Sequence, residues 1–263
     1  MNQEAPQDGT VGKALILLDL VADFGKPIRF NDILAKSPYP KATTYRFLQT
    51  LANQGMLLFD HDTQTYGLGM RLVRLAHSAW QQSSLAPIAR PYIDALSAKI
   101  DQTVHLAQLD GGQVLYVDKR NASRPIAMFS NAGKIGPAYC TGVGKAMLAH
   151  LPEEQRELII LQQSFHQFTE HTITTPDALR DILSEIRKEG VAFDRQEHEP
   201  NIICIAVPIL SSHGKVLGGM SVTTSTERMS LQDLLAYKPS LQFTAKQIGE
   251  ATQTWRFPDT KTT

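Results

Sequence analysis

The chain of 263 residues has little cysteine. Only Cys140 and Cys204 are present. Two thiols cannot build a disulfide framework, and no CxxC pair or Cys/His cluster has the spacing of a zinc site. We expect both cysteines to be small buried apolar residues, and we predict no metal site and no cofactor.

The sequence also lacks a long hydrophobic run and an excess of charge of either sign. Its apolar runs fall short of the ~20 residues that span a membrane, and the first ten residues are polar, without a signal-peptide pattern. These absences predict a cytoplasmic protein with no membrane partner. The equal counts of Lys+Arg and Asp+Glu, 26 each, argue against a protein that coats nucleic acid. A small basic module on a larger neutral body fits this composition better.

Such a basic module lies near the N-terminus. Residues 25–50 contain one acid, Asp32, and five basic side chains, a net charge of +4. Positive charge of this kind suits a phosphate backbone. The five basic residues are Lys26, Arg29, Lys36, Lys41 and Arg46.

Within this module the spacing of apolar residues predicts a helix between Pro40 and Gly55. Compact or apolar side chains recur at i, i+3, i+4 and i+7, at Thr44, Phe47, Leu48 and Leu51. The opposite face is polar, and its side chains are long enough to reach phosphates or base edges. The candidate DNA-binding residues on this face are Lys41, Thr43, Tyr45, Arg46 and Gln49.

The segments on either side complete a winged helix-turn-helix. Residues 56–59 and 65–68 are typical of two short strands, and His61 and Thr63 in the turn between them are further candidate DNA contacts. Upstream, residues 14–22 and 30–35 predict two more helices. An amphipathic helix alone is usually just a solvated helix, so the prediction depends on the ordered set. We assign residues 1–70 to this DNA-binding domain.

The rest of the chain predicts an α+β effector-binding domain over residues 85–263, joined by a linker helix at 71–84. Strands are predicted at 104–109, 114–119, 126–130, 202–210 and 216–224, and helices at 88–100, 142–150, 153–162, 176–188 and 230–254. Strands and helices do not alternate strictly, and the early hairpin around Gly111 and Gly112 favours antiparallel pairing. We therefore expect helices packed on an antiparallel sheet.

Four segments resemble the IclR family of bacterial transcriptional regulators. The run KATTYRFLQTL at 41–51, followed by YGLG at 66–69, looks like its recognition helix and wing. GPAYCTGVGKAMLAHL at 136–151 and GVAFDRQEHEPNIICIAVPILSSHGKVLGGMSV at 190–222 resemble the two signatures of its effector-binding domain. The resemblance implies a GAF-like α/β sensor domain, a homodimer or a dimer of dimers (homotetramer), and a small metabolite that alters operator binding.

Gly142, Gly144 and Lys145 superficially suggest a phosphate-binding loop. A P-loop needs glycine and serine or threonine where this chain has Tyr139 and Ala146, so we do not predict nucleotide binding. The glycines instead open a helix whose N-terminal amides can hold a carboxylate. Alternatively, they only allow the helix to pack closely on the sheet.

Strand alternation gives a candidate effector pocket. Alternation places Cys204 on one face of its predicted strand, and it places Ser221 and Thr223 together on one face of the next strand. A sheet face that carried all three would be unusually polar for a core and would suit a small polar ligand. By resemblance, effector contacts fall on Met128, Gly142, Val143, Asp194, Cys204, Ser221 and Thr223, and we add Phe129 and Tyr139 from their proximity in sequence. The chain departs from the family pattern at Asn201 and in the acidic run 197–199.

These features predict a repressor of a catabolic operon that binds an inverted repeat of double-stranded operator DNA. Its effector would be a small hydroxy or oxo carboxylic acid, whose hydroxyl or hydrated aldehyde Asp194 would bind. A transcriptional activator that responds to an aromatic acid is one alternative. A hydrolase is another, with Cys140 or Cys204 as nucleophile and a histidine among residues 105, 166, 171 and 198 as base, although no nucleophile motif surrounds them.

Overall fold

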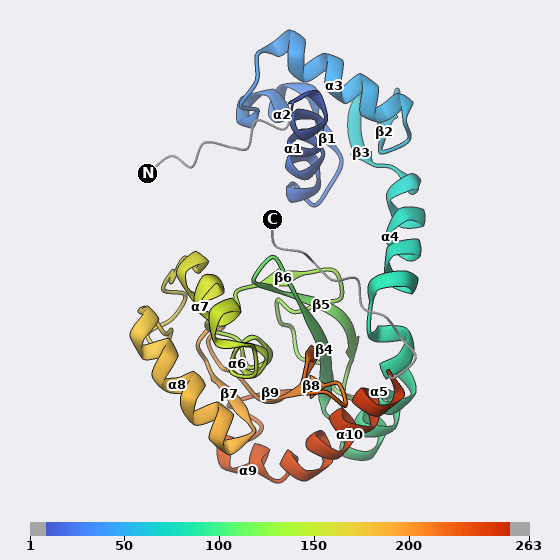
Figure 1. The fold of residues 1–263 in the computed structure, drawn as a ribbon. Coiled ribbons are helices and arrows are strands. Elements are labelled where there is room, and N and C mark those ends of the chain that lie inside the picture. Colours follow the sequence, from blue (N-terminus) through green and yellow to red (C-terminus); the bar gives the residue numbers. More distant parts are fainter. Residues whose placement is uncertain (1–8, 253–263) are drawn as a thin grey trace. The chain divides into compact units, whose positions relative to one another are not determined.

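The computed structural model describes residues 9–252. The chain separates into two compact units, with the division between Gln82 and Ser83 (Figure 1).

The first unit is a winged helix-turn-helix, as predicted. Its helices are α1 (Gly9–Asp23), α2 (Phe30–Lys36), α3 (Lys41–Asn53) and α4 (Met70–Ser83), the last of which runs to the division. Strands β1 (Ile28–Arg29), β2 (Leu57–Asp60) and β3 (Thr65–Leu68) form an antiparallel sheet in the order β1-β3-β2. In the described part of this unit, the two-residue strand β1 is the only element that the sequence analysis did not predict.

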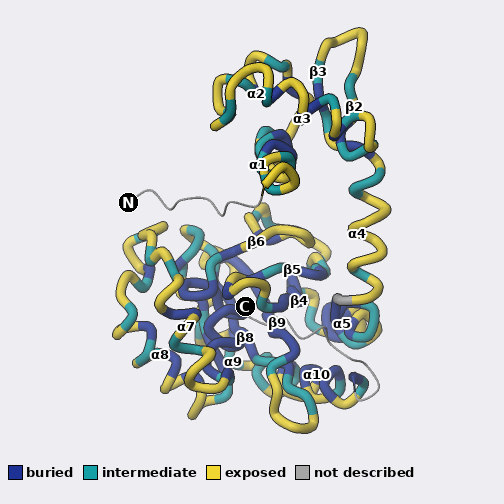
Figure 2. The backbone as a smooth tube through the Cα atoms, turned by 45° about the horizontal axis from the view of Figure 1, so that its top comes forward, coloured by how far each residue is buried: buried dark blue, intermediate teal, exposed yellow. Residues whose placement is uncertain are grey.

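The buried face of α3 holds this unit together. Thr44, Phe47, Leu48 and Leu51 are all buried, as their spacing predicts, and they pack in one core with α1 and the strands. Figure 2 shows buried stretches of backbone in this unit, most clearly in α1. The Thr44 hydroxyl donates to the Tyr39 carbonyl at 3.1 Å, which ties the helix to the preceding turn. Beyond its C-terminus Gly55 has φ +70°, a left-handed conformation that favours glycine, and the chain turns there into β2.

The second unit is built on a six-stranded antiparallel sheet. Its strands are β4 (Thr103–Asp110), β5 (Gln113–Arg120), β6 (Ile135–Gly136), β7 (Ala192–Arg195), β8 (Ile202–Leu210) and β9 (Val216–Ser225). They run in the order β6-β5-β4-β9-β8-β7, and every neighbouring pair is antiparallel. The predicted antiparallel sheet is therefore confirmed, and Figure 1 shows that it curls around α6.

Helices cover this sheet on both faces. The helices are α5 (Ala86–Ile100), α6 (Gly142–Leu148), α7 (Glu153–Gln162), α8 (Pro176–Glu189), α9 (Leu231–Leu235) and α10 (Lys238–Ala251). Helix α6 packs on β7, β8 and β9 and is covered by α8, whereas α5 and α10 pack on each other and on the strands (Figure 1). All seven residues of α6 are buried, which makes it the centre of the core on its side of the sheet.

In this unit two predicted elements were wrong, and two strands were missed. Residues 126–130 form no strand, because the segment leaves the sheet and the Phe129 N–H donates to the Glu199 carboxylate instead of to a strand partner. The predicted helix 230–254 is two helices: α9 ends at Leu235 and α10 begins at Lys238. Pro239, in the first turn of α10, has no N–H with which to continue the first helix. The predicted end of helix 230–254, Thr254, lies outside the described residues. The missed strands are β6 and β7.

Among residues 9–252, no helix has the length and apolar composition that crossing a lipid bilayer would require.

Candidate functional site

The polar face of α3 is the candidate DNA-binding surface. Lys41, Tyr45 and Arg46 are exposed, whereas Thr43 is half-buried. Gln49 is also half-buried, and its amide donates to the Tyr66 hydroxyl at 3.2 Å, so that it joins α3 to the wing. Three of the five predicted helix contacts are therefore fully available to a ligand.

The turn of the wing carries the other two predicted DNA contacts. Asp60 accepts hydrogen bonds from the backbone N–H groups of Asp62, at 2.8 Å, and Thr63, at 3.2 Å, and these bonds hold the turn in a defined shape. They also lower the pKa of Asp60. His61 and Thr63 are both exposed at this tip. The structure thus presents them to solvent on an ordered hairpin.

A small pocket lies in the second unit between α6 and the sheet. Directly opposite residues of antiparallel strands share a face, and Cys204 pairs with Thr223 while Ser221 pairs with His105. The predicted polar face is therefore present, and β4 extends it. The cavity has a volume of about 20 Å³, room for a single water molecule, so a larger ligand must displace part of the lining.

Six of the nine predicted effector residues line this pocket. They are Gly142, Val143, Asp194, Cys204, Ser221 and Thr223. The lining also includes seven residues that the sequence analysis did not select: His105, Tyr116, Ser130, Thr141, His198, Glu199 and Ile202. Of these, His105 could have been identified from the sequence, because it is a titratable residue inside an apolar strand whose alternate positions share one face.

The other three predicted effector residues do not line the pocket. Tyr139 is buried in the core, where its ring packs on Phe165 and its hydroxyl donates to the His166 carbonyl at 2.6 Å. Phe129 and Met128 lie on the irregular segment that replaced the predicted strand. Phe129 has its ring 5.3 Å from that of His198 and 40% of its surface exposed, so proximity in sequence did not bring it into the cavity.

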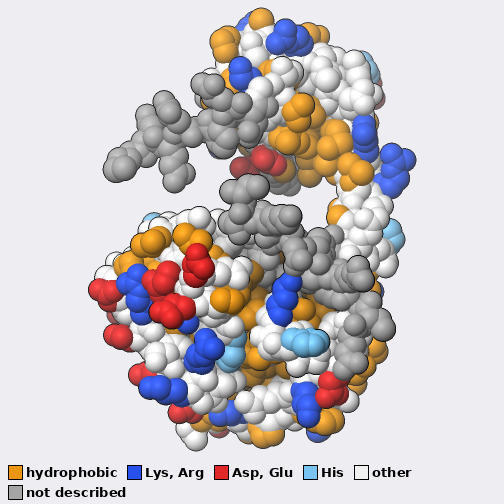
Figure 3. Space-filling view, in the orientation of Figure 1, with side chains coloured by type: hydrophobic (Ala, Val, Ile, Leu, Met, Phe, Trp, Pro, Cys, Tyr) orange, Lys and Arg blue, Asp and Glu red, His pale blue; other side chains and the backbone are white. Residues whose placement is uncertain are grey.

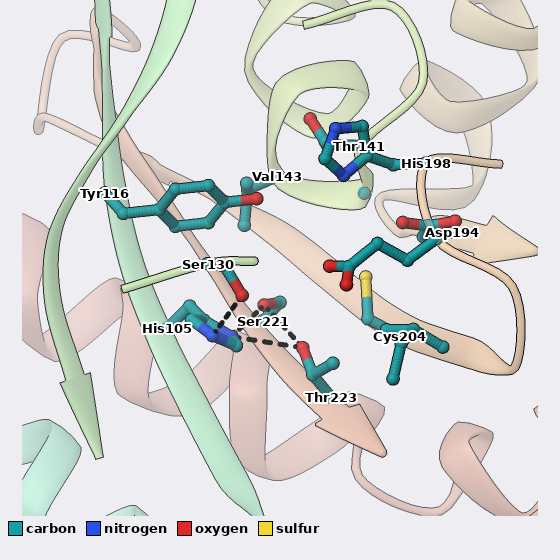
Figure 4. Close-up of a pocket in the computed structure, with 13 residues that line it drawn as sticks. His105, Tyr116, Ser130, Thr141, Val143, Asp194, His198, Cys204, Ser221 and Thr223 are labelled. Carbon is teal, nitrogen blue, oxygen red and sulfur yellow. Dashed lines mark hydrogen bonds between the residues drawn. The ribbon is translucent and has the colours of Figure 1, made fainter. Parts of the chain in front are cut away.

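His105 is the centre of a hydrogen-bond network in the pocket (Figure 4). Its Nδ1 lies 3.1 Å from the Thr223 hydroxyl, and its Nε2 lies 2.9 Å from the Ser130 hydroxyl. The Ser221 hydroxyl lies 3.2 Å from that of Thr223. Burial lowers the pKa of His105 to about 3, so the imidazole is neutral, with one nitrogen donating and the other accepting.

Asp194 faces this network from the other side of the pocket (Figure 4). Its side chain is buried, and Oδ1 accepts a hydrogen bond from the Glu197 N–H at 2.8 Å. Burial, followed by the charge of Glu197, raises its pKa to about 7, while Lys145 acts in the opposite direction. Near neutral pH the carboxyl group therefore exists in both protonation states.

The two glycines of α6 are explained by close packing. A Cβ at Gly142 would lie 2.4 Å from the Cys204 sulfur, and one at Gly144 would lie 2.4 Å from the Ala138 carbonyl oxygen. The helix has only seven residues, which gives its N-terminus a weak dipole. Close packing, on β8 at Gly142 and on the segment before the helix at Gly144, is therefore sufficient to account for both glycines.

Lys145 lies outside the pocket and stabilises the turn that forms one side of it. Its ammonium group forms a buried ion pair with Glu197, whose neighbours His198 and Glu199 line the cavity. Glu197 Oε1 also accepts from the Arg195 N–H at 3.3 Å, but Oε2 has no hydrogen-bond partner among the described residues. The ion pair thus fixes the turn at 196–201 against α6.

Neither cysteine has the properties of a nucleophile. Both thiols are buried, and burial raises the pKa of Cys140 and of Cys204, which keeps them protonated. Among the described residues no group of three His, Cys, Asp or Glu side chains could hold a metal ion.

Comparisons with known proteins decide between a regulator and an enzyme. Residues 10–61 match the IclR helix-turn-helix domain, and residues 77–250 match the family described as bacterial transcriptional regulator IclR C-terminal. The chain belongs to the IclR family of bacterial transcriptional regulators. It is a DNA-binding transcriptional regulator and not an enzyme, which excludes the Cys/His hydrolase.

Individual IclR relatives extend over most of the chain. The HTH-type transcriptional regulator KdgR of Escherichia coli strain K12 is 30% identical over 245 residues, which cover 92% of this chain and 93% of KdgR. The acetate operon repressor of Salmonella typhimurium is 27% identical over 231 residues, which cover 86% of this chain and 84% of the repressor. The crystal structure of the Thermotoga maritima IclR matches with a TM-score of 0.73 at 27% identity, covering 91% of this chain and 97% of that one.

Proposed function

We propose that this IclR-family regulator represses a catabolic operon and that a small hydroxy or oxo acid, bound in the second unit, changes its affinity for the operator. The observation that carries the proposal is the pocket of neutral hydroxyl and imidazole groups around His105, on a chain that also carries an exposed recognition helix. Relatives that are repressors support the sign of regulation. An activator would show the opposite response in a reporter assay.

The division of the chain supports the proposed domains. The DNA-binding domain would comprise residues 1–70, the linker helix residues 71–84 and the effector-binding domain residues 85–263. The division between the two compact units, after Gln82, falls inside this linker. A protein that acts on chromosomal DNA in a bacterium would work in the cytoplasm.

DNA binding would use the exposed face of α3 together with the tip of the wing. We expect Arg46→Ala and Lys41→Ala to weaken operator binding, because both side chains are exposed on a helix whose opposite face is buried. Loss of one phosphate contact should flatten the salt dependence by about one unit, and loss of a base contact should cost about 1–3 kcal/mol at one operator position. Fluorescence anisotropy at several salt concentrations measures both effects.

A matched control is Lys99→Ala, an exposed lysine in the last turn of α5 in the second unit. Its salt dependence should equal that of the wild type. Unchanged affinity and salt dependence in both the Arg46 and the Lys41 variant would refute the assignment of the recognition helix.

A homodimer is the assembly we propose for operator binding. One winged helix reads too few base pairs to find a single site in a genome, and a symmetric pair matches an inverted repeat. Support comes from hydrophobic side chains exposed on the first unit (Figure 3): Val11 on α1 is 71% exposed, and Met70 and Val73 on α4 are 77% and 59% exposed. A second copy that covered them would remove this apolar surface from water.

Effector recognition would use the hydroxyl groups of β9. We expect Ser221→Ala combined with Thr223→Val to raise the acid concentration needed to shift operator binding, because the pair contacts His105 in the cavity. A titration of the operator complex with short acids measures this concentration. Ser212→Ala, an exposed serine in the turn after β8, is the control and should respond as the wild type does. An unchanged response of the double variant would contradict the pocket assignment.

The residues that line the pocket favour a short aliphatic acid over an aromatic one. Phe129 and Tyr139, the two rings that suggested an aromatic effector, lie outside the lining, which keeps Tyr116 and the imidazoles of His105 and His198.

A further inference from the structure

The pocket offers an anion little positive charge. Of the residues within 9–252 that line it, none is a lysine or an arginine, whereas Asp194 and Glu199 are both carboxylates. The short helix α6 adds only a weak dipole at its N-terminus. Because a buried charge is costly unless it is paired, an acid that entered as a bare anion would add uncompensated negative charge beside Asp194.

The cations near the pocket are already engaged. Lys145 is in the buried ion pair with Glu197. The charge of Lys119 interacts with Glu199, and its ammonium group donates to the Asn131 amide oxygen at 3.1 Å. Lys145 also acts on Asp194, but burial outweighs this effect. Of the two carboxylates that line the pocket, Glu199 interacts with Lys119, whereas Asp194 forms no ion pair with a cation among the described residues.

Titratable groups face Asp194 from every element around the cavity. They are Cys140 and Lys145 at α6, Glu197, His198 and Glu199 in the following turn, Cys204 on β8, Tyr116 on β5 and His105 on β4. Burial lowers the pKa of His105 and His198 and raises the pKa of Cys204 and Tyr116. Just above neutral pH these shifts keep the two imidazoles neutral and keep the thiol and the phenol protonated. Asp194 can still accept a proton in that pH range.

We propose, on the basis of the proposed function, that the acid binds as its anion together with one proton, which the Asp194 carboxylate takes up from solvent. The net charge of the occupied pocket is then the same as that of the empty one. The new carboxylic O–H can donate a hydrogen bond to an oxygen of the acid, in place of the repulsion between two carboxylates. The regulator consequently responds to the concentrations of acid and of protons together.

Calorimetric titration of the full-length protein tests this proposal. The probes are glyoxylate, glycolate, pyruvate and L-lactate, which remain anions at every pH used. Each is titrated at about pH 6, 7, 8 and 8.5 in two buffers with different ionisation enthalpies, which gives both the affinity and the number of protons taken up. The variants are Asp194→Asn, which cannot take up the proton, and Glu199→Gln as a matched control that removes the other lining carboxylate.

Binding by the wild type should weaken by ~tenfold per pH unit above about pH 7, with close to one proton taken up at about pH 8. Asp194→Asn should bind with the same affinity at every pH and take up no proton, whereas Glu199→Gln should keep the wild-type slope. Wild-type binding that is independent of pH, or an unchanged slope in Asp194→Asn, would overturn the inference while leaving acid sensing intact. Absence of binding by all four acids at every pH would overturn both the inference and the acid effector, and operator binding would still stand.

Discussion

Replacement of Lys145 by methionine should lower the free energy of unfolding of the second unit by about 3–5 kcal/mol. Both members of the Lys145–Glu197 pair are almost completely buried, with side-chain exposures of 3% and 4%. Methionine fills a similar volume but leaves the Glu197 charge without its counter-ion, and Glu197 Oε2 already lacks a hydrogen-bond partner among the described residues. Differential scanning calorimetry of the full chain measures the change.

Two further variants separate the loss of charge from the loss of packing. Lys145→Met combined with Glu197→Leu removes both charges and should recover much of the lost stability. Lys246→Met removes an exposed lysine, 76% accessible and 3.8 Å from Glu250, and should change stability by less than about 0.5 kcal/mol. Equal effects of the Lys145 and Lys246 variants would contradict a stabilising role for the buried pair.

Acid should destabilise the second unit through His105. Its pKa in the folded state is about 3, against an ordinary value of 6.5, so the unfolded state binds a proton first as the pH falls. The stability contributed by the neutral imidazole is complete above about pH 6.5 and is lost progressively down to about pH 3, by roughly 5 kcal/mol in total. The free-energy difference between wild type and His105→Asn should therefore shrink by about 3 kcal/mol between pH 7 and pH 4.

Asp194→Asn provides a control of opposite sign. The pKa of Asp194 is raised from 3.8 to about 7, so the folded state binds the proton more tightly than the unfolded state does. The stability of the wild type relative to this variant is highest below about pH 3.8 and decreases as the pH rises to about 7. Urea unfolding of both variants over this range measures the two slopes. A His105→Asn difference that does not change with pH would show that the imidazole is not buried neutral.

The DNA-binding unit could be predicted from the sequence because its signals are local. The spacing of Thr44, Phe47 and Leu48 and the stop at Gly55 are set within one helix, and their burial and left-handed φ agree with the prediction. Strand β7 and the segment 126–130 depend on distant partners. Residues 192–195 become a strand by pairing with β8, and the Phe129 N–H donates to Glu199, 70 positions away.

The pocket could be predicted only in part for the same reason. Alternation along two strands identified Cys204, Ser221 and Thr223, because the period of a strand is fixed. His105 lies opposite Ser221 because β4 pairs with β9 in a particular register, and the sequence of either strand alone does not determine that register. Lys145 was considered only as part of a phosphate loop, since its partner Glu197 is 52 positions away.

Selection of genomic DNA fragments by the full-length protein, followed by sequencing, tests most directly whether this chain is an operator-binding regulator. We expect enrichment of one inverted repeat, with half-sites about one helical turn or a multiple of it apart, and loss of that enrichment with Arg46→Ala. Enrichment of no common sequence, or the same enrichment with the Arg46 variant, would contradict it.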